Sequence, residues 1–154
     1  MNPGDREILD HFTRTRNKTI DLVRAVPEEL WNRKAEGEEL PTNKLFAHLT
    51  DAVDFWMNNS LKDGKEVASC RSLGKEDKES VLTALERSRD RLVRFFTADD
   101  GTKLDQAFAH PRTGETFTGR NRLLYLTQHE SHHRGKLVLA LRQWGFKAVP
   151  FLPY

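Results

Sequence analysis

Apolar residues recur three and four positions apart in four separate stretches of the chain, which is the pattern of amphipathic helices that bury one face. Asp5 and Thr42 are the predicted N-caps of the first two helices, and Gly145 is the predicted C-cap of the last. The expected helices run from about Asp5 to Val26, from Thr42 to about Leu61, between Gly74 and Asp99, and from about Arg120 to Trp144. Four such helices predict an all-α fold, most simply a four-helix bundle.

The segments between these helices follow other patterns. Pro27 ends the first helix and begins a short turn that carries Leu30 and Trp31. A polar, glycine-containing connection covers 62–74, and the helical period fails over 99–119. A Pro-Arg-Thr-Gly turn in that second segment predicts a short hairpin or an irregular insertion before the last helix. We expect the tail after Gly145 to pack as extended chain.

Composition and charge narrow the class of protein. The chain has 154 residues, 37% of them hydrophobic and 31% charged, which predicts one globular domain over 1–154. No apolar run approaches the roughly 18 residues that a membrane span needs. The lone cysteine, Cys70, and the lack of a signal peptide predict a cytoplasmic location. Basic residues gather after Gly119 without aligning on one helical face, and the net charge is only +2, which disfavours nucleic-acid binding.

Three histidines crowd into the last predicted helix, at positions 129, 132 and 133. His129 and His133 are one turn apart and leave the same face, so both imidazoles can reach one cation. That face continues through Leu126, Leu137 and further apolar residues, which places the pair in the stripe expected to face the bundle interior. Taken alone, the pair is equally consistent with core histidines bonded to backbone carbonyls.

His48 favours a metal site over core histidines bonded to carbonyls. It lies within the apolar stripe of the second helix, one turn from Leu45 and Ala52, and a neighbouring helix in a bundle could bring it opposite His129 and His133. A single divalent ion satisfies three inward imidazoles, whereas carbonyls alone do so with difficulty. We therefore predict a metal site at these three residues. His132 points away from the pair, and His11 and His110 are interpreted as surface or loop residues.

The sequence His-Glu-x-x-His at 129–133 also fits the zinc-protease pattern, with Glu130 as the general base. Such proteases take a third ligand downstream, and no Asp, Glu or His follows His133. Protease activity is therefore a minor alternative, and the third ligand is expected upstream, at His48.

Several motifs together resemble the DinB-like superfamily (damage-inducible, YfiT-type). They are Pro41-Thr42 followed by Leu-Phe-Ala-His-Leu at 45–49, His-Glu-Ser-His-His-Arg-Gly at 129–135, and the Leu-x-Leu-Arg-Gln-x-x-Gly ending at 139–145. The resemblance covers nearly the whole chain. It implies a four-helix bundle that holds a divalent metal, often Zn²⁺ or Ni²⁺, through one histidine of the second helix and the H-x-x-x-H pair of the last, here His48, His129 and His133. Lys136 and the non-acidic tail depart from the family pattern.

The same resemblance implies an activity, since known members include thiol-dependent transferases and isomerases. Three neutral imidazoles leave an open coordination position, which is typical of a catalytic site. We therefore expect a metal-dependent transferase that joins a small-molecule thiol to an electrophilic substrate. The alternatives are a metal-dependent hydrolase and a non-enzymatic metal-binding stress-response protein that uses the bundle as a homodimer interface.

Helper residues for such chemistry are less clearly marked. Asp51 and Asp54 lie near His48 in sequence, Arg134 follows the ligand pair, and Tyr154 could fold back. Each is more simply explained as a surface or helix-pairing residue. Cys70 is predicted to be neither nucleophile nor ligand, because it lies in the polar connection away from any histidine in sequence.

Overall fold

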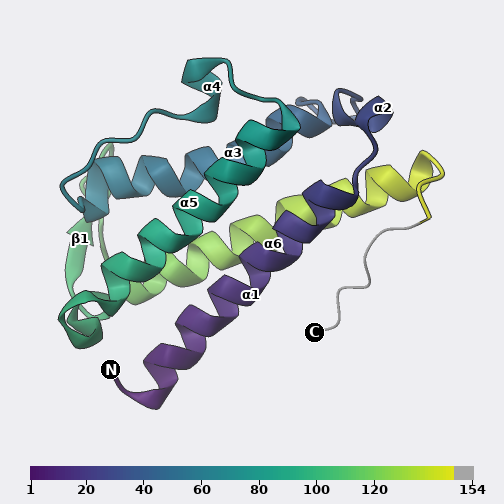
Figure 1. Ribbon diagram of the computed structural model, residues 1–154. Coiled ribbons are helices and arrows are strands. Elements are labelled where there is room, and N and C mark those ends of the chain that lie inside the picture. The colour runs from purple at the N-terminus through teal and green to yellow at the C-terminus, as the bar shows by residue number, and fades with distance from the viewer. Residues whose placement is uncertain (148–154) are drawn as a thin grey trace.

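The computed structural model describes residues 1–147 and confirms the all-α class (Figure 1). The four long helices are α1 (Pro3–Ala25), α3 (Thr42–Trp56), α5 (Lys78–Thr97) and α6 (Gly119–Gln143). Short helical segments join them: α2 (Glu28–Trp31), the π-helical turn η1 (Met57–Leu61), α4 (Cys70–Leu73) and the 3₁₀ segment η2 (Ala98–Leu104). The predicted hairpin is present as β1 (Ala107–Ala109) and β2 (Thr116–Thr118), which pair antiparallel with Phe108 opposite Phe117.

Side-chain caps explain where the helices begin. The side chain of Asn2 accepts the backbone N–H of Asp5, so α1 starts two residues before the predicted cap and Asp5 lies inside it. The prediction for Thr42 is also wrong by one position, because Pro41 is the cap and the Thr42 hydroxyl donates to the carbonyl of Arg33. At the end of α6 the C-cap is Trp144, so the prediction of Gly145 is off by one position, and Gly145, with a φ of 83°, is the left-handed residue that follows the cap.

The long helices form a ring in which α1 packs against α5 and α6, and α3 packs against the same two helices from the other side. Their buried apolar residues form two clusters. One lies at the end of the bundle near α2 and contains Phe46, Leu85 and Leu141; the other lies near the hairpin and contains Phe12, Phe96 and Leu123. The predicted inward residues of the third long helix, here α5, are buried as expected: Val81, Leu85, Leu92, Phe95 and Phe96.

A buried polar group lies between the two apolar clusters. Arg16 of α1 is 1% exposed, and its Nε lies 2.8 Å from Oε2 of Glu130 on α6. Its other two nitrogens donate to the hydroxyl of Ser88 on α5 and to the carbonyl of Leu49 on α3. The guanidinium group of Arg16, on α1, therefore contacts each of the other three long helices.

Two further expectations concern the connections and the tail. The polar connection over 62–74 contains the short helix α4, and Ser69 caps it by accepting the backbone N–H of Ser72. Among the charged residues of α5, Arg87 reaches the buried carboxylate of Asp54 on α3. The expectation of an extended tail falls mostly on 148–154, which lie outside the described residues.

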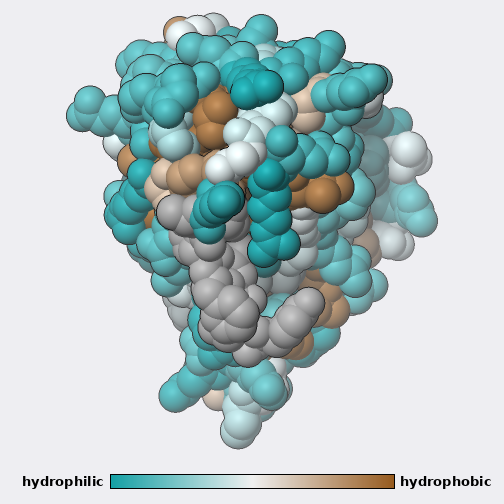
Figure 2. Space-filling model, turned by 90° about the vertical axis from the view of Figure 1, so that its right-hand side faces the viewer, coloured by the Kyte–Doolittle hydropathy of each residue, from teal (hydrophilic) through white to brown (hydrophobic). Residues whose placement is uncertain are grey.

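The surface is consistent with the charged composition. On the face that Figure 2 shows, hydrophilic residues cover most of the area and apolar residues form separate small patches. Within residues 1–147, none of the helices combines the length and the hydropathy that crossing a bilayer requires.

Candidate metal centre

The three predicted histidines converge between α3 and α6. Nε2 of His129 lies 3.1 Å from Nε2 of His48 and 3.1 Å from Nε2 of His133. One ring nitrogen from each residue falls within 4.8 Å of the other two. Three nitrogens at about 2.0 to 2.1 Å from a tetrahedral ion lie roughly 3.3 Å apart, so small side-chain movements would adapt this arrangement to a metal.

The chemistry of the three side chains fits a divalent cation. Each histidine is half-buried, and Nδ1 of His133 is buried without a hydrogen-bond partner. Three Nε2 atoms facing one another cannot all be satisfied by hydrogen bonds among themselves, because each neutral imidazole carries one donor and one acceptor. A shared cation would satisfy all three at once.

Burial also holds these histidines in the form that binds metal. Loss of solvent, reinforced by the neighbouring imidazoles, lowers the pKa of both His129 and His133 to about 4. Burial likewise lowers the pKa of His48, an effect partly opposed by the carboxylate of Asp51. The imidazoles are therefore neutral near pH 7, which is the protonation state of a metal ligand.

Glu130 does not share the centre with its neighbour His129. Its side chain is 1% exposed and pairs with Arg16 of α1, about 100° around α6 from His129. A general base must reach a substrate or its attacking water, and this carboxylate faces the bundle interior. The geometry removes the residue that the zinc-protease pattern would need as its base.

An open pocket of about 570 Å³ leads to the histidines from the side of α3. Its apolar wall is formed by Phe55, Trp56 and Tyr125, and the ring of Tyr125 stacks on that of His129 at 5.9 Å between centroids. The guanidinium of Arg122 packs over the ring of Trp56, 3.5 Å from its centroid, and so helps to hold this wall in place. A small organic molecule can therefore approach the histidines along an aromatic surface.

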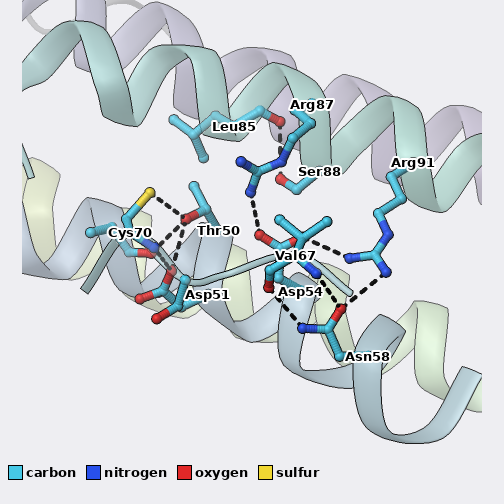
Figure 3. Close-up of polar contacts among 12 residues, drawn as sticks. Thr50, Asp51, Asp54, Asn58, Val67, Cys70, Leu85, Arg87, Ser88 and Arg91 are labelled. Atoms are coloured by element: carbon cyan, nitrogen blue, oxygen red, sulfur yellow. Dashed lines mark hydrogen bonds and ion pairs between the residues drawn. The ribbon is translucent and has the colours of Figure 1, made fainter. Parts of the chain in front are cut away.

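The two aspartates near His48 have different surroundings (Figure 3). Asp51 lines the pocket, and its carboxylate accepts the backbone N–H groups of Cys70 and Arg71. Asp54 is 1% exposed and pairs with Arg87 and Arg91 of α5. Asp54 is therefore a helix-pairing residue, whereas Asp51 lies at the candidate site and positions α4.

The remaining candidates lie elsewhere. His132 and His11 are exposed. Arg134 donates to the backbone carbonyl of Thr15 and so joins α6 to α1. Tyr154 lies outside the described residues.

Cys70 is buried at the start of α4. The hydroxyl of Thr50 lies 3.5 Å from its Sγ, and burial raises the pKa of the thiol. Within residues 1–147 it is not among the residues whose ligand atoms converge at the centre.

Sequence reasoning missed part of the pocket. His110 does lie in a loop, but it also lines the pocket and packs edge-on against Trp56 at 5.1 Å between ring centroids. Arg71 and Arg112 line the same pocket. All three belong to segments without helical periodicity, so no pattern in the sequence placed them near His48.

Comparison with known proteins agrees with this fold. A family model described as the DinB superfamily matches residues 11–137. The protein YjoA of Bacillus subtilis (strain 168), described as uncharacterized, is 25% identical over 147 residues, which is 94% of each chain.

Two solved structures resemble the chain closely. The crystal structure of the DinB-like protein YjoA matches with a TM-score of 0.70 and 22% identity, over 94% of this chain and 96% of that one. The crystal structure of a DinB-like protein from Bacillus cereus matches with a TM-score of 0.72 and 16% identity, over 95% of both chains. These likenesses support the predicted helical fold.

Proposed function

The chain belongs to the DinB superfamily, and on that premise we propose that it is a metal-dependent transferase that joins a low-molecular-weight thiol to an electrophilic substrate. Membership confirms the resemblance found in the sequence motifs. The observation that carries the proposal is the convergence of His48, His129 and His133 beside an open pocket that His48 and His129 line.

Each histidine would hold the metal through Nε2, the atom that points toward its neighbours. Zn²⁺ and Ni²⁺ both accept imidazole ligands, and three such ligands leave a further position for a small molecule. When bound, the ion would act as a Lewis acid that lowers the pKa of a thiol or of water. The protein's own contribution is to hold three neutral imidazoles together beside the pocket.

The pocket supports a thiol transferase over a hydrolase. Glu130, the general base that the zinc-protease pattern would supply to a hydrolase, pairs with Arg16 and does not line the pocket. The aromatic wall of Phe55, Trp56 and Tyr125 suits an organic electrophile. A reducing cytosol, which we propose as the compartment, would supply the thiol.

A conjugation screen tests this proposal. Protein loaded with Zn²⁺ or Ni²⁺ is incubated with a small thiol and a panel of electrophiles, and adducts are measured by mass spectrometry. Adduct formation above the uncatalysed rate should require the metal and should disappear after chelation. Metal-loaded protein that accelerates no conjugation across a broad panel would favour the non-enzymatic metal-binding alternative.

A further inference from the structure

Two arginines stand at the open pocket without acidic partners. Arg71, from α4, and Arg112, from the turn of the hairpin, both line it, and both are exposed. Neither guanidinium forms an ion pair with a carboxylate in the part of the chain that the structure describes. By contrast, Arg16, Arg87 and Arg91, which reach into the bundle, each pair with a buried carboxylate.

Residues of the pocket hold the backbone of both arginines in place. The carboxylate of Asp51 accepts the backbone N–H of Arg71 at 3.4 Å and that of Cys70 at 2.7 Å, which fixes the start of α4. Nδ1 of His110 accepts the backbone N–H of Arg112 at 3.1 Å. The two positive side chains therefore project from anchored segments, which lowers the entropy lost when they bind a ligand.

Arg112 also bridges the charged and aromatic parts of the pocket. Its guanidinium carbon lies 5.5 Å from the ring centroid of Phe55, which belongs to the aromatic wall. Arg71, from α4, lies near enough to His48 for its charge to act on that imidazole. Both arginines therefore line the same pocket as His48 and His129.

The charge balance of the pocket favours an anion. Asp51 is the one carboxylate that lines it within residues 1–147, and its oxygens already accept backbone N–H groups. Two guanidinium groups outweigh that single negative charge, and a divalent cation at the histidines would add two more positive charges. Guanidinium groups are also well suited to carboxylates, which they bind through paired N–H donors.

We propose that the pocket binds a small organic carboxylate, with the carboxylate at Arg71 and Arg112 and the apolar part against Phe55 and Tyr125. This inference rests on the proposed function, because it assigns the substrate class of the same site. It concerns the ligand's charge, whereas the proposed function concerns the metal and the thiol.

A matched pair of thiols tests the inference by spectroscopy. Protein substituted with Co²⁺ is titrated with 3-mercaptopropionate and, separately, with the neutral 3-mercaptopropionamide, and binding is read from the sulfur-to-cobalt charge-transfer band. The quantity of interest is the ratio of the two dissociation constants. The variants are Arg71→Gln, Arg112→Gln and the double variant, with Arg142→Gln, an exposed arginine at the end of α6, as the control for loss of charge.

The pocket variants should change the ratio of the two dissociation constants only by weakening binding of the carboxylate. Each pocket variant should weaken binding of the carboxylate by about fivefold relative to the amide, and the double variant by more, since an exposed charge-assisted contact has about this strength. Arg142→Gln should leave the ratio unchanged. Added salt should reduce the wild-type preference for the carboxylate but not binding of the amide.

The possible failures are distinguishable. If both thiols bind and the ratio is the same in wild type and double variant, the carboxylate assignment is overturned and the proposed function stands. If neither thiol changes the cobalt spectrum, the thiol-dependent function itself is contradicted, and the carboxylate assignment, which rests on it, is overturned as well.

Discussion

Replacing Glu130 by Gln tests whether this residue is structural or catalytic. The change keeps the size of the side chain and removes the negative charge opposite Arg16, which is 1% exposed. The guanidinium would then stay buried without a carboxylate partner on α6, with the Ser88 hydroxyl, the Leu49 carbonyl and the new glutamine carbonyl as its acceptors.

Removing one partner of a buried ion pair costs about 3 to 5 kcal/mol, and a hydrogen bond to the glutamine carbonyl would recover about 1 kcal/mol of that. We expect the free energy of unfolding to fall by about 2 to 4 kcal/mol, which for a chain of this size corresponds to a drop in Tm of roughly 4 to 16 °C.

Urea denaturation and metal analysis of the same preparations provide the readout. Glu130→Gln should lose stability yet keep its metal when folded, because the carboxylate faces away from the histidines. Glu86→Gln is the matched control, since Glu86 pairs with Arg24 on the exposed surface and should contribute little. Adding Arg16→Met to Glu130→Gln should recover part of the loss. Unchanged stability, or a stable variant that has lost its metal or its turnover, would refute the structural assignment.

Three further predictions concern the rest of the fold. Gly119→Ala should lower the free energy of unfolding by about 1 to 3 kcal/mol, because a Cβ there would collide with the Lys103 carbonyl and lie 2.6 Å from Phe96. Gly135→Ala, which has no neighbour within 4 Å, should instead stabilise α6 by up to about 1 kcal/mol. Equal effects of the two changes in thermal melts would contradict this packing. Asp63→Asn should reduce stability by about 1 kcal/mol at pH 7, since Arg91 lowers the pKa of that carboxyl below 3.8. That stabilisation is fully present above pH 3.8, the pKa of the carboxyl in the unfolded chain, and is lost as the pH falls through the lower pKa of the folded state. The denaturation curves of wild type and variant should therefore converge in acid. A difference in stability that does not change with pH would count against the ion pair. Cys70 should react with iodoacetamide slowly in the native protein and quickly in urea, because burial raises the pKa of its thiol, and Cys70→Ser should keep its metal; rapid native labelling would show that the site is open.

The helices were predictable because burial imposes periodicity. Leu45, Leu49 and Val53 repeat at helical spacing and are all buried, as are Val81, Leu85 and Leu92. The error at Asp5 reflects competition between polar residues for the cap, because the Asn2 side chain caps α1 instead. The error at Thr42 has another cause, since its hydroxyl donates to the carbonyl of Arg33, nine residues earlier, and the cap position falls on Pro41.

The histidine cluster was predictable for a related reason, since polar residues within an apolar stripe require partners. The central ion pair was not, because nothing local in the sequence marks Arg16 as buried or directs Glu130 toward it. The pocket arginines were also missed. Arg71 and Arg112 belong to segments whose positions depend on tertiary contacts with Asp51, His110 and Phe55.

The metal content of histidine variants tests the central claim most directly. The protein is purified without nickel affinity chromatography, and metal is measured by inductively coupled plasma mass spectrometry. Wild type should carry about one divalent ion per chain, and both His129→Ala and His133→Ala should carry almost none. His132→Ala, a change at an exposed neighbour in the same helix, should retain the wild-type content. Full metal content in both the His129 and the His133 variants would contradict the account.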